Sequence, residues 1–161
     1  MAIRVQSEGI DVSGELAAFA DATAAGATCL FVGRVRDVNA GVAVAAMTLE
    51  YYPGMAEKEL ARIESAARGQ WPLQDVLVIH RYGRLQPGDE IVLVAVASAH
   101  RDAAFDACRF LVDWLKTRAP FWKSEAGPAG SRWVGARAED DAAAERWEKG
   151  EPLPLDPGAP Q

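Results

Sequence analysis

The chain has 161 residues, half of them apolar, and a formal net charge of -6. This length and composition suffice for one hydrophobic core, and no apolar run reaches the roughly 18 residues that a membrane-spanning helix needs. The acidic balance and the lack of a basic run argue against a nucleic-acid-binding surface. We expect no secretory leader and a cytoplasmic location, and two cysteines are too few for a disulfide scaffold.

The first half of the chain is expected to alternate between strands and helices. Strands are predicted over residues 3–6, 28–35 and 42–52. A helix capped by Ser13 follows the first strand, because short polar side chains favour helix starts. A second helix opens at Pro53-Gly54 and runs to Trp71-Pro72, with Glu64 and Arg68 forming an ion pair on its exposed side.

The second half begins with a predicted hairpin and continues into a long helix. The hairpin comprises residues 76–82, a turn at 86–89 and residues 90–99. The helix runs over about 101–118 and has a buried stripe of Ala104, Cys108, Leu111 and Leu115. A small hairpin over residues 122–135 follows. This order predicts the α+β class, with helices packed on a mainly antiparallel sheet and a small β-hairpin subdomain.

The chain is expected to form a single domain over residues 1–150. Residues 151–161 are rich in proline and are expected to be a disordered tail. The last 24 residues hold seven of the 23 acidic residues and only two of the 17 basic ones. The body of the chain is therefore close to neutral and compatible with an anion-binding site.

The clearest chemical signal is the stretch from Leu115 to Lys123, which combines three cations with two large aromatic residues. Pro120 must end the helix that carries Lys116, so Lys123 lies on a new element and both lysines are free to face one pocket. Phe121 and Trp122 would limit the water around them, which suits a lysine for proton transfer. Alternatively, Lys116 and Arg118 complement the helix dipole and Lys123 is solvated.

Three further basic groups lie where predicted elements end. Arg34 and Arg36 would point to one face of a strand, where they could bind an anion between them. Alternatively, they are charges on an edge strand that discourage aggregation. His100 and Arg101 stand at a helix N-terminus, where cations are unfavourable unless an anion binds. Alternatively, they are exposed residues of a helix start that bind nothing. Arg137 either joins the site or pairs with the acidic tail.

Several common motifs are absent from the sequence. It has no nucleotide-binding glycine loop, no nucleophile elbow and no metal-ligand spacing, so we predict neither a cofactor nor a metal. Cys29 and Cys108 fall in apolar patterns typical of inert core thiols. The remaining candidates form a site of Arg, His and Lys suited to a small phosphorylated molecule.

Several segments, in one order, closely resemble the catalytic (large) subunit family of molybdopterin synthase. They are Phe31–Arg36, Leu49–Met55, Val78–Gly83, Pro87–Glu90, Ser98–Arg101, Lys116–Lys123 and Arg132–Val134. The likeness spans about residues 3–147. It implies an α/β hammerhead-like fold and a sulfurtransferase of molybdenum cofactor biosynthesis, which converts cyclic pyranopterin monophosphate to molybdopterin.

The resemblance also implies partners and site residues. Sulfur would come from the C-terminal thiocarboxylate of a small ubiquitin-like carrier subunit, in a heterotetramer built on a homodimer of this chain. Because the chain ends in Ala159-Pro160-Gln161, we expect it to accept the carrier rather than be one. The implied catalytic residues are Lys116 and Lys123. The implied substrate-binding residues are these two lysines with Arg34, Val35, Arg36, His100, Arg101, Ser124, Glu125 and, from a neighbouring subunit, Arg137.

Two other functions stay open at this point. The chain could be a binding module for phosphorylated ligands or partners that keeps the scaffold without catalysis. It could also be a small phosphatase in which Arg34 and Arg36 cradle phosphate, although the sequence offers no obvious general base for that reaction.

Overall fold

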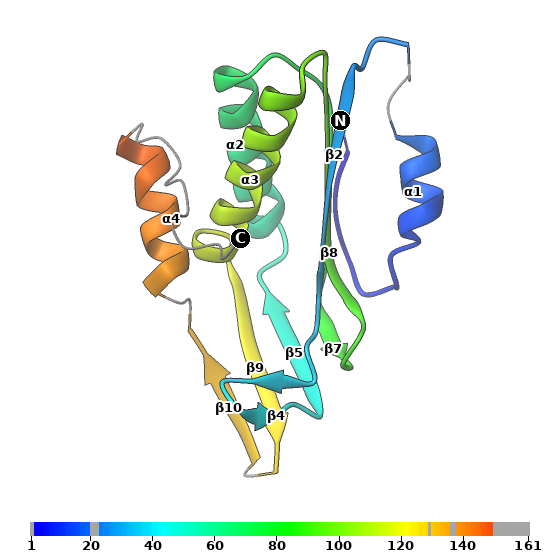
Figure 1. Cartoon of the computed structure of the whole chain (residues 1–161). Helices are drawn as coiled ribbons and strands as arrows, with labels where there is room; N and C mark the ends of the chain where they lie inside the picture. Colours follow the sequence, from blue (N-terminus) through cyan, green and yellow to red (C-terminus); the bar gives the residue numbers. More distant parts are fainter. Residues whose placement is uncertain (1, 20–22, 129, 136–137, 150–161) are drawn as a thin grey trace, which may run out of the picture.

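Two four-stranded sheets lie one above the other, and helices surround the upper sheet (Figure 1). The structure, a computed structural model, describes residues 2–19, 23–128, 130–135 and 138–149. Within these residues the strands and helices confirm the predicted α+β class. No helix in the described ranges is long and apolar enough to cross a membrane.

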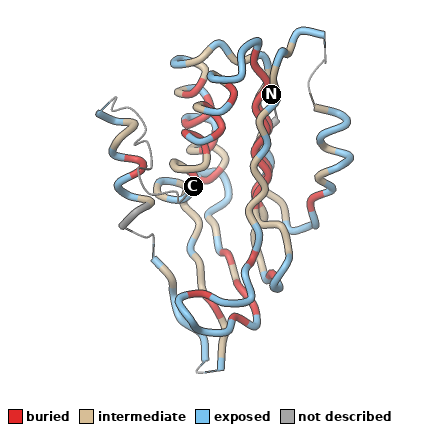
Figure 2. Tube along the Cα trace, viewed as in Figure 1, coloured by how far each residue is buried: buried red, intermediate tan, exposed pale blue. Residues whose placement is uncertain are grey.

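The upper sheet holds the main apolar strands. Its order is β1 (Ala2–Gln6), β6 (Leu73–Arg81), β8 (Glu90–Ser98) and β2 (Ala27–Arg34). β1 runs parallel to β6, and the other neighbours are antiparallel. β6 and β8 are buried on both faces because each is a nearly continuous apolar run. Figure 2 shows this burial concentrated in the middle of the molecule.

Helices cover both faces of this sheet. α2 (Met55–Gln70) and α3 (Arg101–Thr117) pack on one face, and α1 (Val12–Ala18) lies on the other. α4 (Ala138–Lys149) packs against α3. The main core joins α2 and α3 to alternate residues of β6 and β8, such as Leu60, Leu111, Val78 and Val94. The smaller core under α1 uses the opposite face of the same strands.

The lower sheet continues from the ends of the upper elements. Its order is β10 (Gly130–Val134), β9 (Phe121–Gly127), β5 (Ala46–Tyr51) and β7 (Gly83–Leu85). β9 begins directly after α3, so the chain passes from the upper layer into the lower sheet at Pro120. A short hairpin of β3 (Val38–Asn39) and β4 (Val42–Ala43) lies beside this sheet.

Most predicted elements are confirmed, including α3 and its buried stripe. The first helix is capped by Asp11 and not by Ser13, because the Asp11 carboxylate accepts a hydrogen bond from the Gly14 N–H at 3.0 Å. The predicted ion pair of Glu64 with Arg68 forms, but Glu64 is buried and not on an exposed side.

Three further differences concern whole elements. The expected strand over 42–52 is interrupted, because the Val44 and Ala45 N–H groups bond to the carbonyls of Asp37 and Ala126. The predicted hairpin of residues 76–99 contains an extra strand, β7, which joins the lower sheet. α4 was not expected. Residues 151–161, the predicted tail, lie outside the described residues.

Candidate active site

The predicted lysine stretch folds as the sequence indicates around Pro120. α3 ends at Thr117 and Arg118 is its C-cap, so Lys116 lies in the last turn of the helix. Lys123 is the third residue of β9. Both lysines therefore stand near the point where the upper layer meets the lower sheet.

Lys116 reaches toward the start of α4. Its Nζ lies 3.3 Å from Oδ1 of Asp140, and its side chain is 51% exposed. The segment leading into α4 follows β10, whose Val134 pairs with Lys123.

Lys123 belongs to a buried polar network centred on Glu125. Its Nζ lies 2.8 Å from Oε1 of Glu125, a residue only 4% exposed. The Asn39 amide donates to both carboxylate oxygens at 3.0 and 2.9 Å, and Arg132 lies 3.5 Å from Oε2. Burial alone would raise the pKa of Glu125, but the hydrogen bonds from Asn39 and Lys123 outweigh it and hold the pKa below its usual range.

Arg36 is linked to the same network. Its guanidinium donates to Oδ1 of Asn39 at 3.2 Å. The structure therefore brings Arg36 close to Lys123 and Glu125, two predicted site residues of β9 that lie far from it in the sequence.

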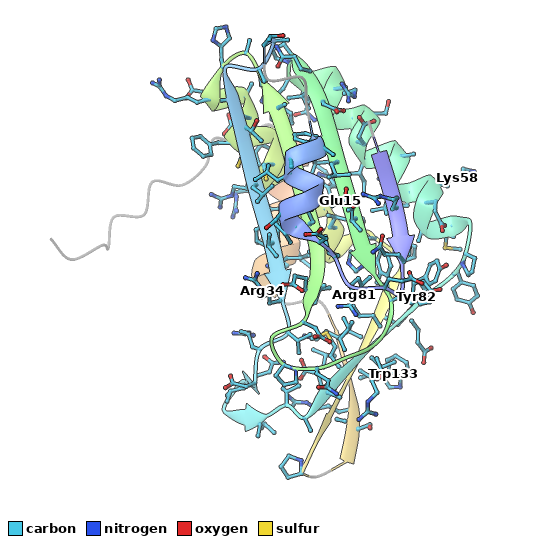
Figure 3. The ribbon with its side chains drawn as sticks, turned by 90° about the vertical axis from the view of Figure 1, so that its right-hand side faces the viewer. Glu15, Arg34, Lys58, Arg81, Tyr82 and Trp133 are labelled. Carbon is cyan, nitrogen blue, oxygen red and sulfur yellow. The ribbon has the colours of Figure 1, made fainter. Side chains whose placement is uncertain are left out.

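The expected clamp of Arg34 and Arg36 does not form by strand alternation. β2 ends at Arg34, after a register shift at Gly33, so Arg36 lies beyond the strand. Arg34 instead pairs with Glu90 at 3.2 Å, near the end of β2 (Figure 3). Val35 between them is 3% exposed, and its backbone groups bond to Gly88 and Asp89.

Ser124 lies away from this network. It stands between Lys123 and Glu125 on β9, so its side chain alternates to the opposite face of the sheet. There it pairs with Thr48 on β5 and with Trp133 on β10.

His100 and Arg101 stand at the far end of α3 from Lys116. His100 is the N-cap and Arg101 the first helical residue, and both are exposed. With a rise of 1.5 Å per residue, the Cα atoms of His100 and Lys116 are about 24 Å apart. One chain alone therefore does not bring these two groups together. Arg137 lies outside the described residues.

The expected aromatic shielding of the lysines is wrong. The Phe121 ring stacks on His80, with centroids 3.7 Å apart, and on Tyr51, while Trp122 packs edge-on against Tyr52. Lys116 and Lys123 have carboxylate partners instead, and Lys123 is still 31% exposed.

A hollow of about 270 Å³ lies beside the lysine stretch, between the start of α2 and the end of α3. Its lining residues are Met55, Lys58, Glu59, Arg62, Arg118 and Pro120. Arg62 and Arg118 both lie over the Trp114 ring, at 5.4 and 5.6 Å from its centroid. Neither Lys116 nor Lys123 lines this hollow.

The cysteine thiols fit the core role predicted for them. Cys108 is 3% exposed, and burial together with neighbouring Cys29 raises the pKa of its thiol. Within the described ranges, no group of three or more His, Cys, Asp or Glu residues is placed to hold a metal ion.

Sequence reasoning missed three residues of the site: Asn39, Arg132 and Asp140. Asp140 belongs to the last 24 residues, which were considered only for their acidic charge. Asn39 lies between the predicted strands of residues 28–35 and 42–52, where no role was predicted for it, although it is the single asparagine of the chain. Arg132 would have followed from the small hairpin, because the strand register places it opposite Glu125.

Comparison with known proteins links the chain to one family. The family described as "MoaE protein" matches residues 5–118. The molybdopterin synthase catalytic subunit of Pseudomonas aeruginosa is 55% identical over 150 residues, covering 92% of this chain and all of the relative.

Solved structures show the same fold. The molybdopterin biosynthesis MoaE protein from Burkholderia ambifaria superposes with a TM-score of 0.77 at 51% identity, covering 91% of this chain and 97% of that one. A Helicobacter pylori structure, described as a complex of subunits 1 and 2 of the molybdopterin-converting factor, has a TM-score of 0.68 at 19% identity. The superposition covers 84% of this chain and 90% of that one. With these matches, the chain belongs to the MoaE family of molybdopterin synthase catalytic subunits.

Proposed function

We propose that this chain is a sulfurtransferase that converts cyclic pyranopterin monophosphate to molybdopterin. The observation that carries the proposal is the arrangement of Lys116 at the end of α3 and Lys123 at the start of β9. In our proposal these lysines orient the carrier's thiocarboxylate and assist proton transfers as sulfur attacks and the cyclic phosphate opens. The reaction takes place in the cytoplasm.

Phosphate binding falls to the arginines around the lysines. Arg36 is exposed and held by a neutral amide rather than by a carboxylate, so its positive charge is available to an anion. Arg34 would have to leave Glu90 to bind phosphate, at little cost because that ion pair is exposed. Val35 supports both arginines from the core. Glu125 pairs with Lys123, and Ser124 follows Lys123 on the opposite face of β9.

The site is proposed to be shared between two copies of the chain. His100 and Arg101 are about 24 Å from Lys116, further than two side chains reach across. In our proposal these residues, with Arg137, serve the lysines of a second copy. A homodimer of this chain, carrying one small subunit on each copy, gives the heterotetramer expected from the sequence.

The partner is proposed to be a small ubiquitin-like carrier that ends in a thiocarboxylate. The Helicobacter pylori structure described above contains two different subunits, which supports a heteromeric assembly. A donor that brings its own sulfur also agrees with the buried state of Cys108.

The direct test is conversion of the cyclic precursor by this protein with thiocarboxylated carrier. We expect Lys116→Ala and Lys123→Ala each to lower turnover by about a hundredfold or more, the usual scale for a lost proton-transfer group. Lys149→Ala, which removes an exposed lysine of α4, is the control and should leave turnover unchanged.

The same assay separates the alternative functions. A binding module would bind the precursor without forming a dithiolene product, and a phosphatase would release inorganic phosphate without the carrier. Full activity of Lys116→Ala would overturn its assigned role.

A further inference from the structure

Asn39 lies at the centre of the network that joins the hairpin of β3 and β4 to the lysine strand. The residue is 7% exposed. Its amide nitrogen donates to both oxygens of Glu125, and its carbonyl oxygen accepts from Arg36. One side chain thus contacts the partner of Lys123 on one side and a proposed phosphate-binding arginine on the other.

The chemistry of these contacts requires a group that both donates and accepts hydrogen bonds. A carboxylate offers only acceptors and a guanidinium only donors, so the group between Glu125 and Arg36 must donate to one and accept from the other. Asn39 does both in one orientation. An aspartate would face Glu125 with like charge, and an alanine would leave a buried carboxylate without two of its hydrogen bonds.

The backbone holds the hairpin close to β9. The Ala45 N–H donates to the carbonyl of Ala126 at 2.9 Å. A Cβ atom on Gly127 would lie only 2.8 Å from the Ala43 carbonyl oxygen. The glycine therefore permits a close approach, which places the Asn39 amide within reach of Glu125.

We propose that Asn39 is a positioning residue that fixes Arg36 and Lys123 relative to each other through Glu125. This inference rests on the proposed function, because it concerns the geometry of that reaction. In this role Asn39 acts through Glu125 and Arg36 and not by contact with substrate or carrier. It keeps the carboxylate of Glu125 directed at Lys123 while it directs the guanidinium of Arg36 toward the same end of the molecule.

The decisive variant is Asn39→Asp, which keeps the shape but replaces the donor by a carboxylate. Two adjacent carboxylates share a proton, so the pair is tolerated at low pH and repelled when both ionise. The charged groups that face this pair are Lys123, Arg132 and Arg36. We expect kcat to fall by about tenfold or more near pH 8, with a partial return toward pH 6, and KM for the precursor to change less.

Two companion variants make the test specific. Val38→Asp adds the same charge at the neighbouring exposed position and should leave kcat and its pH profile unchanged. Asn39→Asp/Glu125→Gln exchanges the carboxylate and the amide between the two positions. It should remove the added pH dependence and recover part of the lost kcat.

A second readout does not depend on catalysis. Because Asn39 is the single asparagine, selective ¹⁵N-asparagine labelling leaves one side-chain NH2 group to follow in NMR, as a pair of peaks at one nitrogen frequency that is the signal used here. We expect this signal to shift as Glu125 is protonated in acid, and to keep its position through that pH range in Glu125→Gln.

The outcomes distinguish this inference from the proposed function. Wild-type kcat in Asn39→Asp at every pH, or a loss that is equal at every pH and not recovered by the exchanged pair, would overturn the positioning role. An amide signal that ignores the protonation of Glu125 would also overturn it. The proposed function itself would fail on different results, namely full turnover in Lys123→Ala or no turnover in the wild type.

Discussion

The surroundings of the His80 imidazole strongly oppose its charge. It is 7% exposed and stacked on Phe121, and burial lowers its pKa from 6.5 to about 4, despite a hydrogen bond with the Arg81 carbonyl. The folded protein thus keeps this ring neutral where an unfolded chain takes up a proton. His80 stacks on Phe121, the first residue of β9, and so packs directly against the strand that carries Lys123.

This shift predicts how stability depends on pH. Between about pH 6.5 and pH 4 the unfolded state binds more protons than the folded state, so the free energy of unfolding falls as pH is lowered. The loss from His80 is at most about 3 kcal/mol. Urea unfolding at several pH values in a His100→Gln background, where His80 is the single histidine, measures it. His80→Phe should flatten the profile in this range, and an unchanged slope would contradict the assignment.

At the residue scale the sequence identified charges better than their partners. Lys116, Lys123 and Arg36 stand near the junction of the two layers, as their positions beside Pro120 and at a strand end suggested. The partner of Lys116, Asp140, lies 24 residues further along the chain, and the Asn39–Glu125 contact that links Arg36 to Lys123 spans 86 residues. Such pairs depend on tertiary packing, and no spacing rule in the sequence predicts them.

At the element scale, α4 contributes more than its acidic composition suggests. The Trp147 indole donates to Oδ2 of Asp113 at 2.9 Å and packs edge-on against Trp71 and Phe110. These contacts attach α4 to α3 and bring Asp140 to Lys116. The docking of one helix therefore places the carboxylate beside the proposed catalytic lysine.

We predict that Trp147→Ala destabilises the protein by about 2–3 kcal/mol, because it removes aromatic contacts and leaves the Asp113 carboxylate without its indole donor. Hydrogen exchange of the α4 amides should accelerate more than that of α2. Trp133→Ala is the control, since this side chain is 64% exposed, and it should change stability by less than about 0.5 kcal/mol. Equal exchange in both helices would show that Trp147 does not secure α4.

The elements that the sequence reading missed share a physical cause. β4 and β5 were read as one strand because an apolar run continues through Val44, and only the bonds to Asp37 and Ala126 divide it. α4 was overlooked because its acidic residues were grouped with the proline-rich tail. The spacing of Ala143, Ala144 and Trp147 at one face of a helix was the available signal.

At the scale of the whole molecule, α3 sets the distance between the two groups of proposed site residues. β2 and α3 run from the same end of the molecule toward the lower sheet, so Arg34 and Lys116 both lie near that sheet. His100 and Arg101 stay at the opposite end. The predicted helix over 101–118 already implied this separation, and the sequence left open whether one chain supplies both ends of the site.

Mixing two inactive variants tests the shared site most directly. One variant carries Lys116→Ala and the other His100→Ala with Arg101→Ala, and each alone should show almost no turnover with thiocarboxylated carrier. In an equimolar mixture that exchanges subunits, half of the dimers are mixed and each mixed dimer has one intact site, so turnover should recover to about a quarter of wild type. A mixture that stays as inactive as its components, with mixed dimers demonstrated by mass spectrometry, would contradict a site built from two chains.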